Sequence, residues 1–217
     1  MTYSIAGRCA RTGAFGIAIT SSSICVPSRC AWVSATGAVL TQNITDPQLG
    51  PLGLSFLAQG MGAKGVLAQL VGATAFSAYR QLAVIDRAGQ TASFSGEKAL
   101  PLFAEAHGTD CVAVGNILAD KAVPATMIDT FVRTAEQSLP ERLMRALEAG
   151  LAAGGETGDE RAAGLHVADR YTWPVVDLRV DWHDDPIVEL RRVWTLYEPQ
   201  MQDYITRAVN PGAAPAF

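Results

Sequence analysis

This sequence has little charge and no basic run, and that shortage excludes one large class of partners. Charged residues make up 18% of the 217 residues, and the formal net charge is −4. Such a chain lacks the positive footprint of a nucleic-acid-binding protein. Low charge combined with 49% hydrophobic residues favours a large core and buried interfaces. We therefore expect a homo-oligomer, most simply a two-fold dimer.

Cysteine and histidine are also scarce, which argues against a metal centre. The four cysteines have irregular spacing and form no CxxC pair, so the common zinc motifs are missing. None of the three histidines has a metal-ligand partner at helical or strand spacing. Residues 154–158 (GGETG) lack the lysine of a phosphate-binding P-loop. We expect no metal and no cofactor.

Long hydrophobic runs are missing as well. Polar or charged residues interrupt every apolar stretch before it reaches the length of a membrane span. Residues 1–5 (MTYSI) do not have the charged and apolar regions of a signal peptide. These features predict a cytoplasmic protein that has no membrane partner and whose cysteines are thiols.

Residues 29–46 (RCAWVSATGAVLTQNITD) carry the densest set of reactive groups. Arg29 places a fixed cation beside the thiol of Cys30, and Gln42, Asn43 and Asp46 follow a strand-like run. Polar side chains at a strand end are where binding sites are often built. Asp46 before a proline is equally typical of a capped turn that starts a helix. Both interpretations remain open, because Asn and Asp are ordinary turn residues.

Hydrophobic periodicity predicts an α+β fold. The expected strands are 3–8, 14–20, two short strands within 32–40, 80–86, 90–95, 109–114, 163–168 and 175–181. The expected helices are 47–60, 62–73, 120–135, 139–152 and 186–208, the last kinked or broken by Pro199 near Glu198. Hairpin-linked strands and paired helices favour two stacked sheets with helices outside, a four-layer αββα sandwich. We expect one domain over residues 1–208 and an irregular tail over 209–217.

Three further polar groups are candidates for a site. Ser22 belongs to a hydroxyl cluster at a strand end, which would form either a pocket wall or a solvated turn. Asn116 follows a strand and a glycine, and could donate to an oxyanion or simply occupy a left-handed turn position. Asp177 and Arg179 alternate on one strand face. They could bind a polar substrate, although an ion-paired sheet edge is the favoured interpretation.

Several motifs together carry a family resemblance. They are residues 2–8 (TYSIAGR), 16–18 (GIA), 21–23 (SSS), 29–32 (RCAW), 41–46 (TQNITD), 114–118 (VGNIL), 153–156 (AGGE) and 177–183 (DLRVDWH). The chain resembles the bacterial domain-of-unknown-function family 1028 from its first residues to its last helix. Residues 159–161 (DER) look unusual for that pattern. The resemblance implies the αββα sandwich of the N-terminal nucleophile (Ntn) hydrolases.

An Ntn hydrolase attacks an amide with the side chain of its first mature residue, whose α-amine acts as the base. Removal of Met1 would make Thr2 that nucleophile, whereas a retained Met1 would leave Thr2 without a free amine. Cys30 is the second candidate, because Arg29 could lower the pKa of its thiol. Asn43 or Asn116 would stabilise the oxyanion.

The sequence thus predicts an amidohydrolase that cleaves a C–N bond of a small molecule. The candidate substrate-binding residues are Gln42, Asp46, Ser22, Asp177 and Arg179. Two alternatives remain open: a non-catalytic small-molecule-binding protein, and an oligomer-forming protein on the same scaffold.

Overall fold

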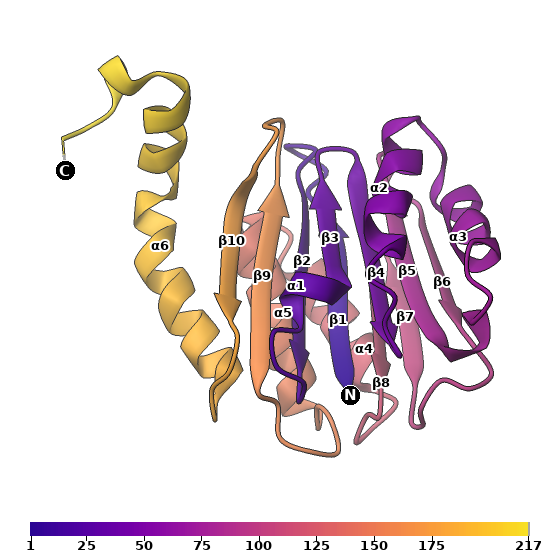
Figure 1. Ribbon diagram of the computed structural model, residues 1–217. Coiled ribbons are helices and arrows are strands. Elements are labelled where there is room, and N and C mark those ends of the chain that lie inside the picture. Colours follow the sequence, from indigo (N-terminus) through magenta and orange to yellow (C-terminus); the bar gives the residue numbers. More distant parts are fainter. Residues whose placement is uncertain (217) are drawn as a thin grey trace.

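Two antiparallel sheets organise residues 1–216, the part of the chain that this computed structural model describes (Figure 1). The six-stranded sheet has the order β10 (Pro174–Val180), β9 (Ala162–Ala168), β2 (Phe15–Ser21), β1 (Thr2–Arg8), β8 (Cys111–Asn116) and β7 (Ala104–Gly108). The four-stranded sheet has the order β3 (Ala31–Ser34), β4 (Gly37–Asn43), β5 (Arg80–Asp86) and β6 (Thr91–Ser95). Every neighbouring pair of strands is antiparallel.

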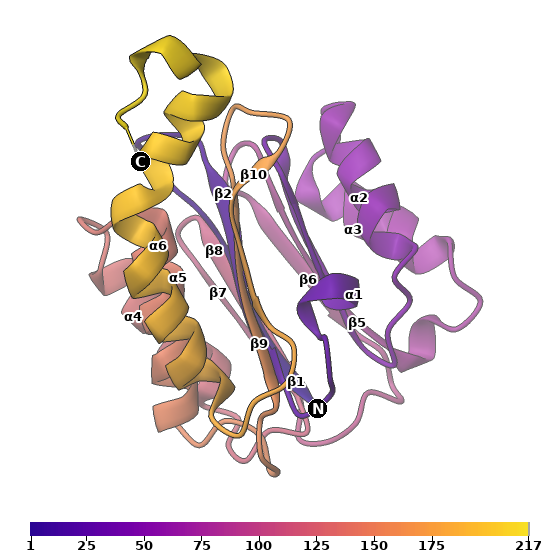
Figure 2. The same ribbon diagram turned by 60° about the vertical axis from the view of Figure 1, so that its left-hand side comes forward.

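Among the described helices, all but the short first one lie on the outer faces of the sheets, and the first contacts strands of both sheets (Figure 2). The helices are α1 (Pro27–Cys30), α2 (Leu49–Ala58), α3 (Ala63–Gly72), α4 (Val123–Arg133), α5 (Leu139–Ala152) and α6 (Pro186–Val209). The last three pack on the six-stranded sheet, and α2 and α3 pack on the four-stranded one. The sheets also contact each other, for example through β1 with β4 and β5 with β8. The prediction of a mixed α+β protein built on two sheets is confirmed.

The alternation of side chains along the central strands explains this arrangement. Successive residues of a strand point to opposite faces, so β1 sends Tyr3 and Ile5 toward the helices and Ala6 toward the other sheet. Both faces are covered, and all three residues are fully buried. Close helix packing needs small residues here, because a Cβ at Gly7 would lie 2.5 Å from Phe131 Cζ.

Some elements differ from the sequence prediction. Strand β7 (AEAHG) was missed, because its apolar positions are only alanines and it has no β-branched or aromatic residue; it pairs with β8. Helix α6 is continuous through Pro199, so a break at that residue is wrong, although the ribbon bends along its course (Figure 1). The predicted irregular tail contains a 3-10 turn at Pro211–Ala213, and residue 217 lies outside the described part. Another such turn, Ser77–Tyr79, leads into β5.

Among the described helices, none combines the length and apolar composition needed to cross a membrane.

Candidate functional site

One end of the space between the two sheets is polar, whereas its middle is apolar. Along β2 the residues that face the other sheet are Ile17 and Ile19, and the next in register is Ser21. The residues that face the other sheet also change from apolar to polar at the corresponding ends of β1, β4, β5 and β8. The polar residues at these positions, all buried, are Thr2, Ser4, Ser21, Gln42, Gln81 and Asn116. Five strands from two sheets therefore meet in one buried polar cluster, which we call the inter-sheet cluster.

Hydrogen bonds within the inter-sheet cluster cross from one sheet to the other. Ser4 Oγ donates to Gln42 Oε1 at 2.7 Å, and Gln42 Nε2 donates to Gln81 Oε1 at 2.8 Å. Asn116 Nδ2 donates to the same Gln81 oxygen at 3.0 Å. Gln81 Nε2 in turn donates to the carbonyl oxygen of Gly115 at 3.0 Å. The two glutamines thus fix Asn116 in place, and sequence reasoning had singled out only Gln42 of the pair.

Thr2 lies at the head of β1 within this cluster. Its Oγ1 is 3.2 Å from Ser21 Oγ, and both hydroxyls donate to the carbonyl oxygen of Met1. Thr2 is also the strand partner of Asn116, which places their Cα atoms about 5 Å apart. The structure therefore brings Thr2 and Asn116, both predicted site residues, side by side.

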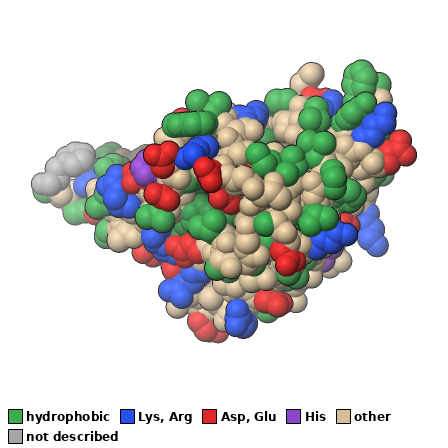
Figure 3. All heavy atoms as spheres, turned by 90° about the horizontal axis from the view of Figure 1, so that it is seen from below, with side chains coloured by type: hydrophobic (Ala, Val, Ile, Leu, Met, Phe, Trp, Pro, Cys, Tyr) green, Lys and Arg blue, Asp and Glu red, His purple; other side chains and the backbone are tan. Residues whose placement is uncertain are grey.

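Met1 covers Thr2 and leaves it only 5% exposed. The hydroxyl of Thr157 lies 3.8 Å from Met1 Sδ, and a Cβ at Gly158 would lie 3.3 Å from Met1 Cε. Figure 3 shows the surface at this end of the molecule, where uncharged and hydrophobic atoms occupy much of the face. The cluster is thus covered by the first residue of the chain.

Glu156 is a buried carboxylate beside the same end of the chain, and sequence reasoning read its segment only as a turn. Its Oε2 accepts a hydrogen bond from Ser22 N at 3.2 Å, whereas Oε1 is buried without a partner. Burial raises the pKa of Glu156 to about 8. The N-terminal amine and the Ser22 bond act against that rise, and the nearby charge of Glu160 adds to it.

Cys30 and Arg29 do not form the activated thiol that their adjacency suggested. Cys30 is 2% exposed, and its Sγ lies 3.3 Å from Thr45 Oγ1. Burial raises the pKa of the thiol, and it outweighs the lowering by Thr45 and by the charge of Arg29. The guanidinium of Arg29, a half-buried residue, donates to the carbonyl oxygen of Ile24.

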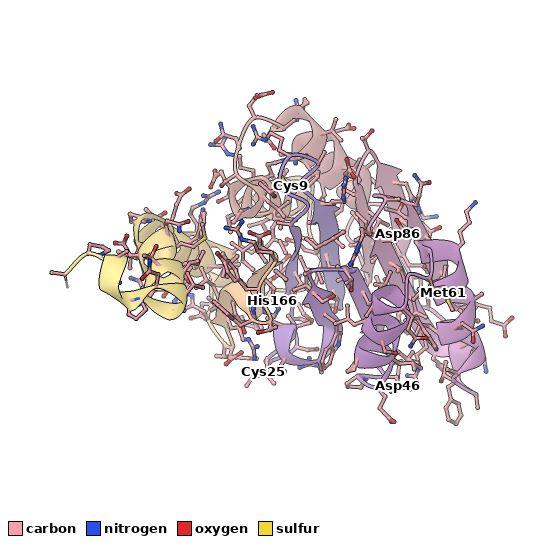
Figure 4. All side chains as sticks on the ribbon, turned by 90° about the horizontal axis from the view of Figure 1, so that it is seen from above. Cys9, Cys25, Asp46, Met61, Asp86 and His166 are labelled. Carbon is pink, nitrogen blue, oxygen red and sulfur yellow. The ribbon has the colours of Figure 1, made fainter. Side chains whose placement is uncertain are left out.

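Asn43 and Asp46 hold turns, although they lie close to Gln42 in sequence. Asn43 has a left-handed backbone (φ 72°), and its Nδ2 donates to the carbonyl oxygen of Tyr79 at 2.6 Å. Asp46 Oδ1 accepts from Gln48 N at 3.2 Å just before α2, and its other oxygen lies 3.8 Å from Arg80 Nη2. Figure 4 shows Asp46 beside the purple helices, away from His166. Of residues 42–46, only Gln42 belongs to the inter-sheet cluster.

Asp177 and Arg179 form an ion pair on β10, the edge strand of the six-stranded sheet. Arg179 donates to both carboxylate oxygens of Asp177, at 2.8 and 2.9 Å. His166 Nε2 lies 3.2 Å from Asp177 Oδ1, and burial lowers the pKa of that histidine. Three strand spacings, about 14 Å, separate β10 from the strand that carries Thr2. The structure therefore does not bring this pair to the inter-sheet cluster.

The chain is thus an α+β protein in which two antiparallel sheets carry helices on their outer faces and enclose a buried polar cluster at one end. The chain belongs to a family of unknown function, DUF1028, whose model matches residues 2–190. It is similar to the crystal structure of protein SPO2555 from Silicibacter pomeroyi, described as a DUF1028 protein, with 28% identity and a TM-score of 0.86. That match covers 94% of this chain and 89% of the other. No curated protein matches the sequence.

Proposed function

We propose that this protein is an Ntn-type amidohydrolase that cleaves a C–N bond of a small molecule, with Thr2 as its nucleophile. The observation that carries the proposal is the position of Thr2. Its hydroxyl lies at the head of a central strand, 3.2 Å from Ser21 Oγ and opposite Asn116. Two stacked sheets with helices on both outer faces support an αββα sandwich of the Ntn type.

The mechanism begins with removal of Met1, which frees the α-amine of Thr2. That amine takes the hydroxyl proton as Thr2 Oγ1 attacks the substrate carbonyl. An amide nitrogen carries two hydrogens, so Asn116 Nδ2 keeps one donor after bonding to Gln81. Asn116 would use this second hydrogen to stabilise the oxyanion, and the two glutamines would hold it in position.

A strained ester can test this proposal without a known substrate. We expect a β-lactone to acylate Thr2 Oγ1 once Met1 is removed. Ring opening expels no group, so the intact mass should rise by the full mass of the probe. Thr2→Ala should abolish the adduct, and Cys30→Ser should retain it. Mass spectrometry of the intact protein and of its N-terminal peptide measures both.

Two results would contradict the proposal. A native protein that retains Met1 and forms no adduct would point to a non-catalytic binding protein, because Thr2 would then have no free amine. An adduct that survives in Thr2→Ala and disappears in Cys30→Ser would make the thiol the nucleophile instead.

A further inference from the structure

The buried carboxylate of Glu156 lies beside the N-terminal end of the chain and has one oxygen without a partner. The chain binds it on one side only, because Ser22 N donates to Oε2 at 3.2 Å while Oε1 has no hydrogen bond. The residue is 6% exposed. A buried carboxylate oxygen without a hydrogen bond is rare in native proteins, so this oxygen needs an explanation.

Residues that bind or follow Glu156 connect it to the end of the chain that carries Thr2. Ser22, which binds its carboxylate, follows Ser21, whose hydroxyl lies 3.2 Å from Thr2 Oγ1. Thr157 follows Glu156 and contacts the side chain of Met1. The positive charge of the Met1 α-amine lowers the pKa of Glu156 and so opposes the effect of burial.

The other groups that face Glu156 do not supply a positive charge. Glu160 Oε1 accepts from the backbone nitrogen of Glu156 at 3.2 Å, and its charge raises the pKa of Glu156. Tyr3 OH is fully buried without a partner, and burial together with the charges of Glu160 and Glu156 raises the pKa of that phenol. The α-amine of Met1 is a cation that acts on this carboxylate, and removal of Met1 would move the free amine one residue along the chain, to Thr2.

An unfilled acceptor also exists on the other side of Thr2. Asn116 Oδ1, from the strand partner of Thr2, is buried without a hydrogen bond. An α-ammonium carries three hydrogens, which one hydroxyl cannot satisfy. The two free acceptor oxygens at this end therefore suit a charged amine.

We propose that Glu156 is a positioning residue that holds the α-amine of Thr2 after Met1 is removed. This inference rests on the proposed function. When Thr2 Oγ1 attacks a carbonyl, its proton moves to the α-amine, and the Glu156 carboxylate stabilises the ammonium that forms. With a β-lactone the Oγ1–C bond forms, the ring C–O bond breaks, and the ammonium returns its proton to the released alkoxide.

A simpler role for Glu156 is to hold the turn that follows α5. The backbone already meets that need, because Gly155 N donates to the carbonyl oxygen of Gly150 at 3.0 Å and Thr157 N donates to that of Ile117 at 3.1 Å. A turn role explains neither the burial of the carboxylate nor its free oxygen. It also predicts no effect on the pH profile of acylation, which separates the two roles by experiment.

The test compares the β-lactone acylation rate of Thr2 in the protein that starts at Thr2 and in Glu156→Gln. Glutamine keeps the shape and can still accept from Ser22 N, but it carries no charge. We expect acylation to slow about 10- to 100-fold, with Met1 removal and the thermal melting curve unchanged. The wild-type rate should fall on the acid side as the α-amine of Thr2 becomes protonated, and loss of the Glu156 charge should move that fall to lower pH in Glu156→Gln.

Glu160→Gln is the matched control, because it removes the other carboxylate of the same turn. It takes away a negative charge but leaves the Glu156 carboxylate, so the acid fall should move less than in Glu156→Gln while the plateau rate stays within about 3-fold. If the acylation rate of both Glu160→Gln and Glu156→Gln falls at the same acid pH as that of wild type, a group that neither carboxylate affects is titrating.

Failure of this inference differs from failure of the proposed function. If Thr2 is acylated and Glu156→Gln reacts at the wild-type rate with the same pH profile, Glu156 has no positioning role but Thr2 remains the nucleophile. If Thr2 is not acylated in the wild-type protein that starts at Thr2, the proposed function itself fails.

Discussion

At the scale of single residues, burial decides which side chains can react. Thr2, Asn116 and Glu156 are all buried polar residues, and each has at least one polar contact at the N-terminal end of the sandwich. Cys30 is equally buried, but its neighbours belong to the apolar core between the sheets. A position at a strand end is therefore not enough to make a side chain reactive, since the surrounding side chains determine the ionisation of each group.

The thiol of Cys30 should react slowly with alkylating reagents. It is 2% exposed and burial raises its pKa, so little thiolate is available at neutral pH. With iodoacetamide at pH 7.5, we expect the half-buried Cys25 to react at least about 10-fold faster than Cys30. Peptide mapping of the alkylated protein measures both rates, with Cys25→Ser as the control. Preferential labelling of Cys30 would restore the thiol as a candidate nucleophile.

At the scale of elements, polar contacts join α6 to the rest of the molecule. Arg191 Nη1 lies 2.6 Å from Glu141 Oε2, and its Nε and Nη2 lie 2.7 and 2.9 Å from the Glu148 carboxylate. Trp194 Nε1 donates to Glu141 at 3.1 Å. Both carboxylates belong to α5, so one arginine links the two helices.

Loss of that link should destabilise the protein. Arg191→Met removes the cation that pairs with Glu148 and leaves Glu141 with Arg145 alone, and we expect a loss of about 1–3 kcal/mol in the free energy of unfolding. Urea denaturation followed by circular dichroism measures it. Arg192→Met is the matched control, because Arg192 pairs with Glu189 within α6 and is largely exposed. Equal effects of the two changes would show that the interhelical link adds nothing.

The same link has a predicted dependence on pH. Burial of Glu141 acts to raise the pKa of that carboxyl, but hydrogen bonds from Arg191 and Arg145 outweigh it and lower the pKa below the ordinary 4.5. A carboxyl with a lowered pKa stabilises the fold above its unfolded value and loses that contribution as the pH falls through the folded value. The acid loss of stability should therefore be smaller in Arg191→Met than in wild type.

At the scale of the whole molecule, some large apolar side chains outside the strands and helices remain exposed to solvent. Trp194 is buried, whereas Trp173 and Trp182 are 38% and 58% exposed. Trp173 stacks on Tyr171 with ring centroids 4.8 Å apart. Both residues, together with Trp32, line a hollow of about 680 Å³. Aromatic residues of this kind are enriched at protein interfaces.

We therefore predict that the protein is a homodimer in solution, with Trp173 at its interface. Light scattering at micromolar concentration should give twice the mass of one chain. Trp173→Ser should shift the equilibrium toward the monomer, because it removes an anchor whose loss typically costs about 2 kcal/mol or more. Trp182→Ser tests whether any exposed tryptophan has the same effect. A wild-type monomer at that concentration would exclude this assembly.

Much of the fold follows from local sequence. Short apolar runs predicted β1, β2, β5 and β9 to within one residue at each end, because strands covered on both faces need apolar residues on both. They did not predict β7, whose small and polar residues form a strand only because β8 offers a partner. Pro199 predicted a kink or a break in α6, and the helix continues through that residue.

The sequence by itself determined most of the strand pattern and pointed to Asn116 and Gln42, because their types stand out at strand ends, whereas Thr2 was indicated by the family resemblance. Only the tertiary structure decided which polar groups meet. Gln81 and Glu156 have ordinary local contexts, and their importance comes from burial beside residues far away in the chain. Asn43 and Asp177 have suggestive contexts, yet turn and edge contacts occupy them. Periodicity depends on neighbours a few positions apart, whereas desolvation and hydrogen-bond partners depend on which strands pack together.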